Sequence, residues 1–127
     1  MESGYPKEPA AESLMQDEGG RELIRLGIGV RRDIIVEAGY KTEPGLPEAM
    51  GAAMSELTAL AKDKAIMAAS LIKAADIARR LPADDPETPK YAAIAELMLH
   101  ECLRNYSMSY NRAREERLKK RAAEKED

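Results

Sequence analysis

The chain lacks tryptophan and phenylalanine altogether, and its 127 residues include one cysteine and one histidine. A single cysteine excludes a framework of disulfides within the chain. No apolar run approaches the roughly 18 to 20 residues that span a bilayer, and the first residues lack the charged region and the apolar core of a signal peptide. We therefore expect a cytoplasmic protein that has no membrane partner.

An excess of positive charge is also missing. The formal net charge is −3 with 34% charged residues, and no segment is strongly basic overall. Binding to nucleic acid requires clustered Lys and Arg that neutralise phosphates, so nucleic acid is a poor candidate partner. A chain of this length predicts a single domain with one modest core.

The apolar residues that are present make up 44% of the chain and are mostly aliphatic. Isoleucine, leucine, valine, alanine, methionine and some of the five tyrosines must therefore build the core. Methionine fills irregular gaps and also lines adaptable binding grooves. The set of Met50, Met54, Met67 and Met98 predicts core packing, with a groove for a partner as the alternative.

Residues 1–18 are polar and contain two prolines and a glycine. We expect a mobile extension with at most a short helix around Ala10–Gln16. After the break at Gly19-Gly20, apolar residues alternate with polar or small ones, which is typical of a strand with one buried face. The alternating residues are Ile24, Leu26, Ile28 and Val30.

Residues 31–33 then predict a tight connection, and residues 34–40 alternate again as a return strand of a hairpin. Gly27 and Gly29 lie on the face opposite the apolar one. They either allow something to approach the sheet closely or simply weaken the strand, and the sequence leaves both open.

Helix signals begin after Pro47, because proline prevents a helix in the turn before it. Apolar spacing predicts a helix over residues 48–61, a short one over 65–72, and another over 77–81 that Asp76 would cap. A stiff acidic loop with three prolines follows.

The last predicted helix begins near Pro89–Lys90, runs through Tyr106 and continues past Arg112. The tail 112–127 alternates in charge sign and has few apolar residues. It is therefore either a solvated helix end or disordered.

These elements, in this order, resemble the NifU/IscU-type scaffolds for iron–sulfur cluster assembly over roughly residues 20–106. The residues that carry the resemblance are Ile34–Thr42, Lys62–Lys64, Ile72–Ala78, Ala95-Glu96 and Tyr106. The resemblance implies an α+β fold, a small antiparallel sheet packed on one face by Ala/Met-rich helices, with a long C-terminal helix. The implied divisions are a mobile extension (1–18), a NifU/IscU-like domain (19–111) and a charged helix end or tail (112–127).

The scaffolds that the chain resembles hold a cluster or zinc with three cysteines and an aspartate. Here the corresponding places hold other residues: Gly19, Gly20, Arg21 and Glu22 at the first, Leu46 and Pro47 at the second, and Lys90 and Tyr91 at the third. None of these supplies the thiolate that iron–sulfur clusters prefer. The resemblance therefore implies a degenerate member with no cofactor and no metal.

Other candidate ligands lie on the last predicted helix. Glu96 and His100 share a face at i and i+4 and could hold a metal weakly, whereas Cys102 belongs to the apolar side with Leu97 and Leu103. The plainer interpretation is an exposed histidine and a buried, inert thiol. A histidine and a cysteine two positions apart on a helix face different directions, so they form no nucleophile–base pair. We expect no catalytic residues and no enzyme.

A partner-binding surface is predicted at the end of this helix, because tyrosine and arginine are enriched at interface hot spots. Its residues are Tyr106, Tyr110, Arg112 and Arg114. The sequence thus favours a non-catalytic accessory or structural subunit of a larger complex, with a homo-oligomer as one possible arrangement. The alternative is an assembly protein that binds metal transiently through Glu22, His100 or Cys102 together with ligands from a partner. A stand-alone helical regulator is a third hypothesis.

Overall fold

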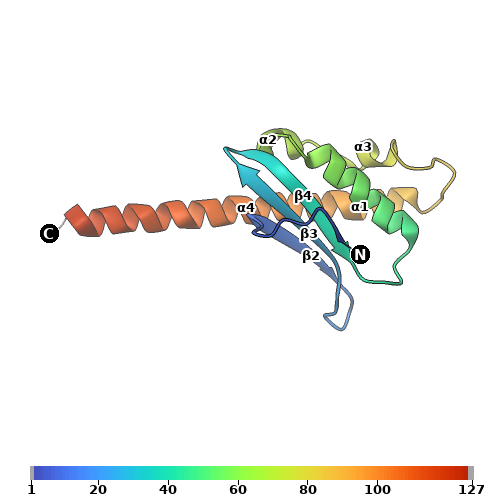
Figure 1. Cartoon of the computed structure of the whole chain (residues 1–127), viewed down its shortest axis with the longest axis horizontal. Coiled ribbons are helices and arrows are strands. Elements are labelled where there is room, and N and C mark those ends of the chain that lie inside the picture. The colour runs from blue at the N-terminus through green and yellow to red at the C-terminus, as the bar shows by residue number, and fades with distance from the viewer. Residues whose placement is uncertain (1, 126–127) are drawn as a thin grey trace.

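The computed structural model describes residues 2–125, and it has the predicted α+β architecture. The strands come first in the chain, and the helices follow (Figure 1). The strands are β1 (Glu2–Ser3), β2 (Ala11–Gln16), β3 (Glu22–Arg31) and β4 (Ile34–Thr42). The helices are α1 (Glu48–Ala61), α2 (Ile66–Ala69), α3 (Ala74–Ala78) and α4 (Thr88–Lys125).

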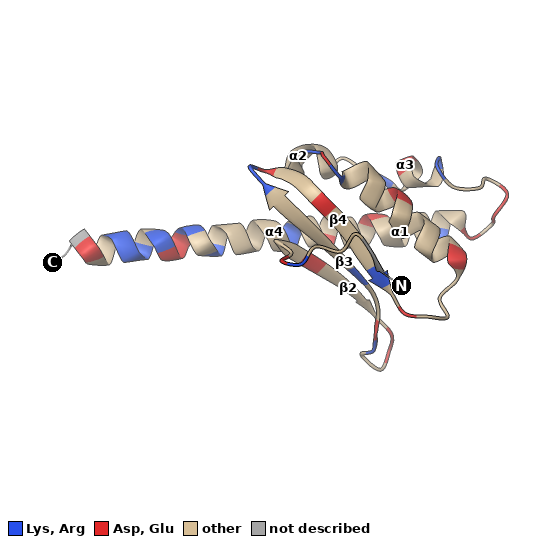
Figure 2. Ribbon diagram, in the orientation of Figure 1, with Lys and Arg blue, Asp and Glu red and all other residues tan. Residues whose placement is uncertain are grey.

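The last half of α4 leaves the body of the molecule, so the tail 112–125 is a helix end (Figure 1). Every side chain from Ser107 to Glu124 is exposed. Lys and Arg outnumber Asp and Glu on this protruding part (Figure 2). None of the helices among residues 2–125 combines the length and the apolar character that crossing a membrane requires.

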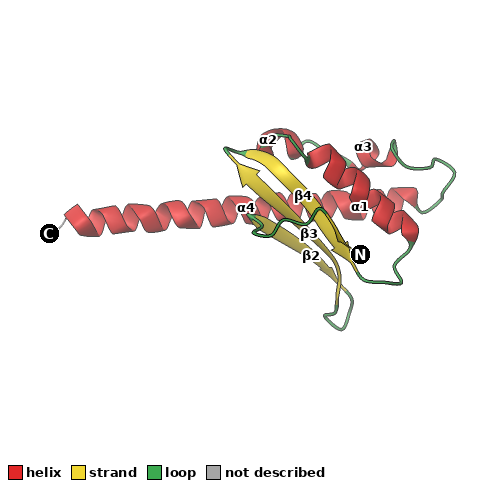
Figure 3. Ribbon diagram, viewed as in Figure 1, coloured by secondary structure: helices red, strands yellow, loops and turns green. Residues whose placement is uncertain are grey.

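The sheet is antiparallel with the strand order β1-β4-β3-β2, and the helices cover one of its faces (Figure 3). Helix α1 packs on β4, and α4 packs on β2 and β3. The buried face of β3 is formed by Ile24, Leu26 and Ile28, as the alternation predicts. The opposite face is crossed by the segment between β1 and β2, because these two strands lie at opposite edges of the sheet.

The expectation of a helix around Ala10–Gln16 is wrong, because residues 11–16 form β2 and pair with β3. Ala11 and Ser13 face the core, and the hydroxyl of Ser13 donates a hydrogen bond of 2.7 Å to the carbonyl oxygen of Met98 in α4. The predicted boundary between an extension and the domain therefore falls inside the β2–β3 hairpin.

The connection between β3 and β4 is as tight as predicted. Arg32 and Asp33 both have positive φ, 53° and 62°, which is the backbone of the two-residue hairpin turn that matches strand twist. A bulge beside Val30 shifts the register, so that Ile35 pairs with Val30 and is fully buried. Ile34 and Val36 consequently lie on the outer side, 36% and 37% exposed.

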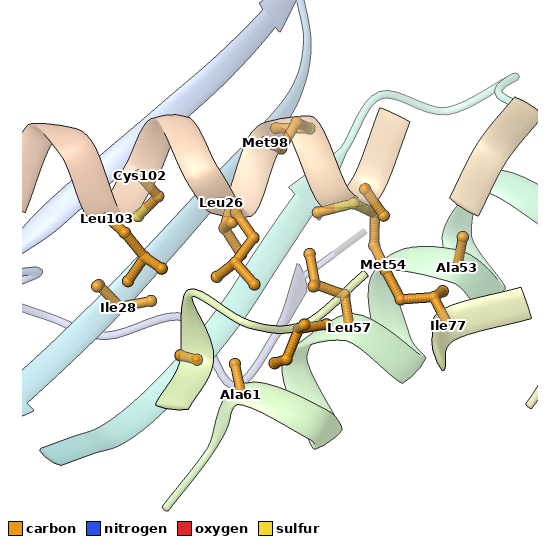
Figure 4. Close-up of a cluster of buried hydrophobic side chains, with 14 of the residues drawn as sticks. Leu26, Ile28, Ala53, Met54, Leu57, Ala61, Ile77, Met98, Cys102 and Leu103 are labelled. Atoms are coloured by element: carbon orange, nitrogen blue, oxygen red, sulfur yellow. The ribbon is translucent and has the colours of Figure 1, made fainter. Parts of the chain in front are cut away.

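The core lies between the sheet and the helices, and Figure 4 shows Leu26 and Ile28 of β3 facing side chains of α1 and α4. The prediction of core packing is confirmed for three of the four methionines. Met50, Met54 and Met98 are buried in this core, whereas Met67 on α2 is 83% exposed.

The helices differ from prediction mainly at their ends. Helix α1 has the predicted bounds, while α3 begins at Ala74 and places Asp76 inside its first turn. The carboxylate of Asp76 accepts a hydrogen bond of 2.9 Å from the backbone N–H of Lys73. Asp76 therefore stabilises the start of α3 from a position inside its first turn. The prediction that Asp76 precedes a helix over 77–81 is wrong.

Candidate functional site

The three segments that correspond to the family's ligand positions lie toward the same end of the molecule. These are the β2–β3 turn, the loop between β4 and α1, and the start of α4 (Figure 1). A side-chain ion pair of 3.7 Å joins Arg21 of the turn to Glu43 of the loop. Leu46 of the loop and Tyr91 of α4 both pack against the same core. The three segments thus lie toward one end of the domain, and the ion pair joins the first two of them.

At the first position the polar groups already form hydrogen bonds within the chain. The backbone N–H groups of Gly19 and Arg21 each donate a hydrogen bond of 2.9 Å to Asp17 Oδ1, which closes the turn. Arg25 Nε donates to Glu22 Oε1 at 3.0 Å. This hydrogen bond lowers the pKa of the Glu22 carboxyl below its usual range. Glu22 therefore stays ionised and paired with a cation.

The second and third positions contribute no soft donor. Leu46 is half-buried, and Pro47 accepts the backbone N–H of Met50 at 3.0 Å as α1 begins. A cleft of about 410 Å³ lies beside Leu46 and Pro47, and its other walls are mainly apolar. In α4, the ammonium of Lys90 lies 3.9 Å from a carboxylate oxygen of Glu87 and 5.7 Å from the ring centroid of Tyr91.

These side chains do not fit an iron–sulfur cluster. A cluster needs about four donors at one point, preferably thiolates, and these positions offer aliphatic groups, a phenol, two cations and one carboxylate that is already paired with Arg25. Within the described part of the chain, no group of three or more His, Cys, Asp or Glu side chains could hold a metal ion.

The single thiol lies elsewhere. Cys102 is fully buried in the core under α4, next to Leu103 (Figure 4). Burial raises the pKa of the thiol from its ordinary value of 9.0 to about 12. A protonated, inaccessible thiol is a poor metal ligand and a poor nucleophile, which agrees with the prediction of an inert cysteine.

The other candidate metal ligands are occupied or isolated. Glu96 Oε1 accepts a hydrogen bond of 3.0 Å from the backbone N–H of Ala74, so this carboxylate supports the start of α3. His100 is partly buried, and its Nε2 is buried without a hydrogen-bond partner among residues 2–125. The expectation of an exposed histidine is therefore wrong. Leu97, predicted on the apolar side, is 66% exposed.

The predicted partner surface is partly attached to the domain and partly free. The hydroxyl of Tyr106 donates to Asp33 Oδ1 at 3.3 Å, and its ring centroid lies 6.4 Å from that of Tyr110. Burial and the carboxylate of Asp33 raise the pKa of Tyr106. Tyr110 is 52% exposed, and Arg112 and Arg114 lie on the free part of α4.

The sequence analysis did not foresee a cluster on the outer face of the sheet. The ring of Tyr5 lies on Gly27, where a β-carbon would come within 2.7 Å of Tyr5 Cζ. The Tyr5 hydroxyl donates to the carboxylate of Glu12, and Arg25 Nη1 lies 2.8 Å from Glu12 Oε2. The ammonium of Lys41 lies 4.4 Å from the ring centroid. Of the two interpretations of Gly27, close approach is the one that the structure supports.

Comparison with known proteins agrees with the fold. A family model described as the NifU-like N terminal domain matches residues 8–113. No curated protein sequence matches the chain significantly. The family match covers most of the chain and includes β2. The chain belongs to the family of NifU-like N-terminal domains, whose members include scaffolds for iron–sulfur cluster assembly.

Proposed function

We propose that this chain is a cluster-free, non-catalytic member of its family that serves as an accessory or structural subunit and binds partner proteins in a larger complex. Family membership supports a complex that handles iron–sulfur or redox proteins. The observation that carries the proposal is the location of the only thiol. Cys102 is sealed in the core, whereas the end of the domain with the three family positions carries no thiolate.

The free end of α4 supports the partner-binding part of the proposal. Tyr106 is fixed by the domain, and Tyr110 stacks beside it while remaining half exposed. An aromatic side chain that is held in place loses little conformational entropy when a partner covers it. Tyr110 is therefore the anchor that we assign to this surface, with arginines further along the helix.

The test is anaerobic reconstitution with ferrous iron and sulfide, followed by iron and sulfide analysis and native mass spectrometry. We expect the natural chain to remain metal-free. The matched control restores thiols at the three places through Gly19→Cys, Leu46→Cys and Tyr91→Cys. This variant should gain iron, because it returns thiolates to the three family positions, which lie toward the same end of the domain.

A stoichiometric cluster on the natural chain would overturn the proposal. Native mass spectrometry of the chain captured anaerobically from its own host then tests the second half. A metal-free chain within a defined larger assembly supports an accessory subunit. A metal-free monomer with no partner would instead favour the stand-alone regulator.

The alternative is transient metal binding with ligands from a partner. Glu22, His100 and Cys102 are not brought together by the fold, since Glu22 is paired with Arg25 and Cys102 is fully buried. The Cys102→Ser variant separates the two proposals. Iron that is captured in the native complex and lost in this variant would favour the alternative.

A further inference from the structure

The free half of α4 continues the face of the helix that packs against the domain. A helix turns about 100° per residue, so positions three or four apart lie on one face. Leu99 and Leu103 on this face are buried, and Tyr106 is partly buried. Beyond the domain the same spacing leads to Tyr110 and then to three exposed arginines. We name the set of Tyr110, Arg114, Arg117 and Arg121 the arginine stripe.

The arginine stripe has almost no acidic neighbours within its own helix. The positions three and four residues from Arg114 and Arg117 hold no Asp or Glu, and Arg121 has only Glu124 at this spacing. The structure also gives these three arginines no ion pair among residues 2–125. Like charges at this spacing destabilise a helix. Arg114 and Arg117 therefore carry charge that no acidic side chain of the described helix compensates at this spacing, whereas Arg121 has Glu124 beside it.

The basic residues outside the stripe have a different pattern. Arg112, Lys119 and Lys120 each have a glutamate three or four positions away, from the set Glu115, Glu116 and Glu124. Such pairs are typical of a helix face that remains in solvent. Helix spacing thus distinguishes these basic residues from Arg114 and Arg117, which have no glutamate at this spacing. The predicted partner residue Arg112 has Glu115 and Glu116 at this spacing and lies about 160° from Tyr110.

Carboxylates fit the stripe better than phosphates of a nucleic acid. Residues 1–111 contain 13 basic and 18 acidic residues, so the attached domain repels a long polyanion. A helix of a partner protein is short enough to contact the arginine stripe without also lying against the acidic domain. Glutamates at three and four spacing would match the arginines, and an apolar residue beside them would cover Tyr110.

We infer that the arginine stripe docks an acidic helix of a partner protein, with Tyr110 as the apolar anchor. This inference rests on the proposed function and adds the chemical class of the partner. Arginine forms bidentate bonds with carboxylates, and the complementary potentials also fix the register of the two helices.

The experiment measures binding of a labelled alanine-based helical peptide that carries glutamates at three and four spacing along one face. Three forms of the full chain are compared: the natural one, the stripe variant Arg114→Glu, Arg117→Glu, and the matched control Lys119→Glu, Lys120→Glu. Both variants change the net charge equally at exposed positions. We expect the stripe variant to lose at least about tenfold in affinity and the control to keep its affinity.

A second peptide with lysines in place of the glutamates should bind the stripe variant and not the natural chain. Equal losses in both variants would overturn the inference, because they would indicate unspecific attraction. Absence of peptide binding, or tighter binding of a DNA oligonucleotide, would also overturn it. Self-association of the natural chain in sedimentation that the stripe variant abolishes would overturn it in favour of a second copy.

Expression of both variants in the host separates this inference from the proposed function. Loss of the native assembly in the stripe variant alone supports the inference. If the assembly persists in both variants, the stripe is not the docking surface, while the proposal of a cluster-free subunit stands. If the natural chain forms no assembly, the proposed function itself fails.

Discussion

Gly27 lies beneath the ring of Tyr5, on the face of the sheet that no helix covers. The ring buries Gly27, although Gly27 lies on the face of β3 opposite the apolar residues, where the alternating pattern predicts contact with solvent. The carboxylate of Glu12 and the ammonium of Lys41 hold the tyrosine in place. A single missing side chain thus allows the segment after β1 to lie flat across the sheet.

The Gly27→Ala substitution should lower the free energy of unfolding by about 1 kcal/mol, because the new β-carbon displaces the Tyr5 ring. In a Tyr5→Ala background the same substitution should be neutral or stabilising by up to about 1 kcal/mol, since alanine restricts the unfolded chain more than glycine does. Urea unfolding of the four proteins gives this double-mutant cycle. An equal cost in both backgrounds would contradict the packing of Tyr5 on Gly27.

Cys102 predicts a pH dependence of stability. Its thiol has an ordinary pKa of 9.0, and in the folded chain burial raises this value to about 12. Above pH 9 the unfolded chain releases this proton and the folded chain keeps it, so stability is complete below pH 9 and falls as the pH rises toward 12. The slope from this group is at most about 1.4 kcal/mol per pH unit.

The measurement compares the natural chain with Cys102→Ala by urea unfolding between pH 8 and about pH 11. The variant is expected to be less stable at pH 8, because a buried group is lost. It should also lose less stability as the pH rises. Parallel pH profiles for the two proteins would show that the thiol is not the group that titrates.

At the scale of elements, the β3–β4 hairpin and α1 could be predicted, because both have regular apolar spacing and are stabilised by neighbours in sequence. Strand β2 could not be predicted in the same way. A serine occupies its central core-facing position, and the acceptor for that hydroxyl, Met98, lies 85 residues away. The amide of Asn105 also donates to the carbonyl oxygen of Glu12 at 2.8 Å. Both contacts exist only after α4 has docked.

Deletions at the two ends should therefore have opposite results. Removal of residues 1–18 takes away β2 and uncovers an edge of β3, so we expect loss of cooperative unfolding and aggregation. Removal of residues 112–127 takes away helix whose side chains are exposed from Arg112 to Glu124, so the free energy of unfolding should change by less than about 0.5 kcal/mol. Urea unfolding followed by circular dichroism checks both, and a stable protein without residues 1–18 would contradict the role of β2.

The whole molecule has two dissimilar ends. One end gathers the three segments that correspond to the family's ligand positions, and the other is the free part of α4 (Figure 1). The helix of 38 residues is about 57 Å long, so a partner on the arginine stripe would leave the end with the three segments uncovered. The domain is acidic over residues 1–111, and the basic residues gather in the free helix (Figure 2). This separation of charge favours a partner at the helix end.

The sequence by itself determined the fold class, the hairpin, the helices that follow it and the absence of thiols from the three ligand positions. These depend on residue types and local spacing, which are readable along the chain. Only the tertiary structure decided that β2 completes the sheet, that Tyr5 fills the space above Gly27 and that His100 is partly buried. Each of these is set by contacts between residues far apart in the chain, and no local pattern specifies such contacts.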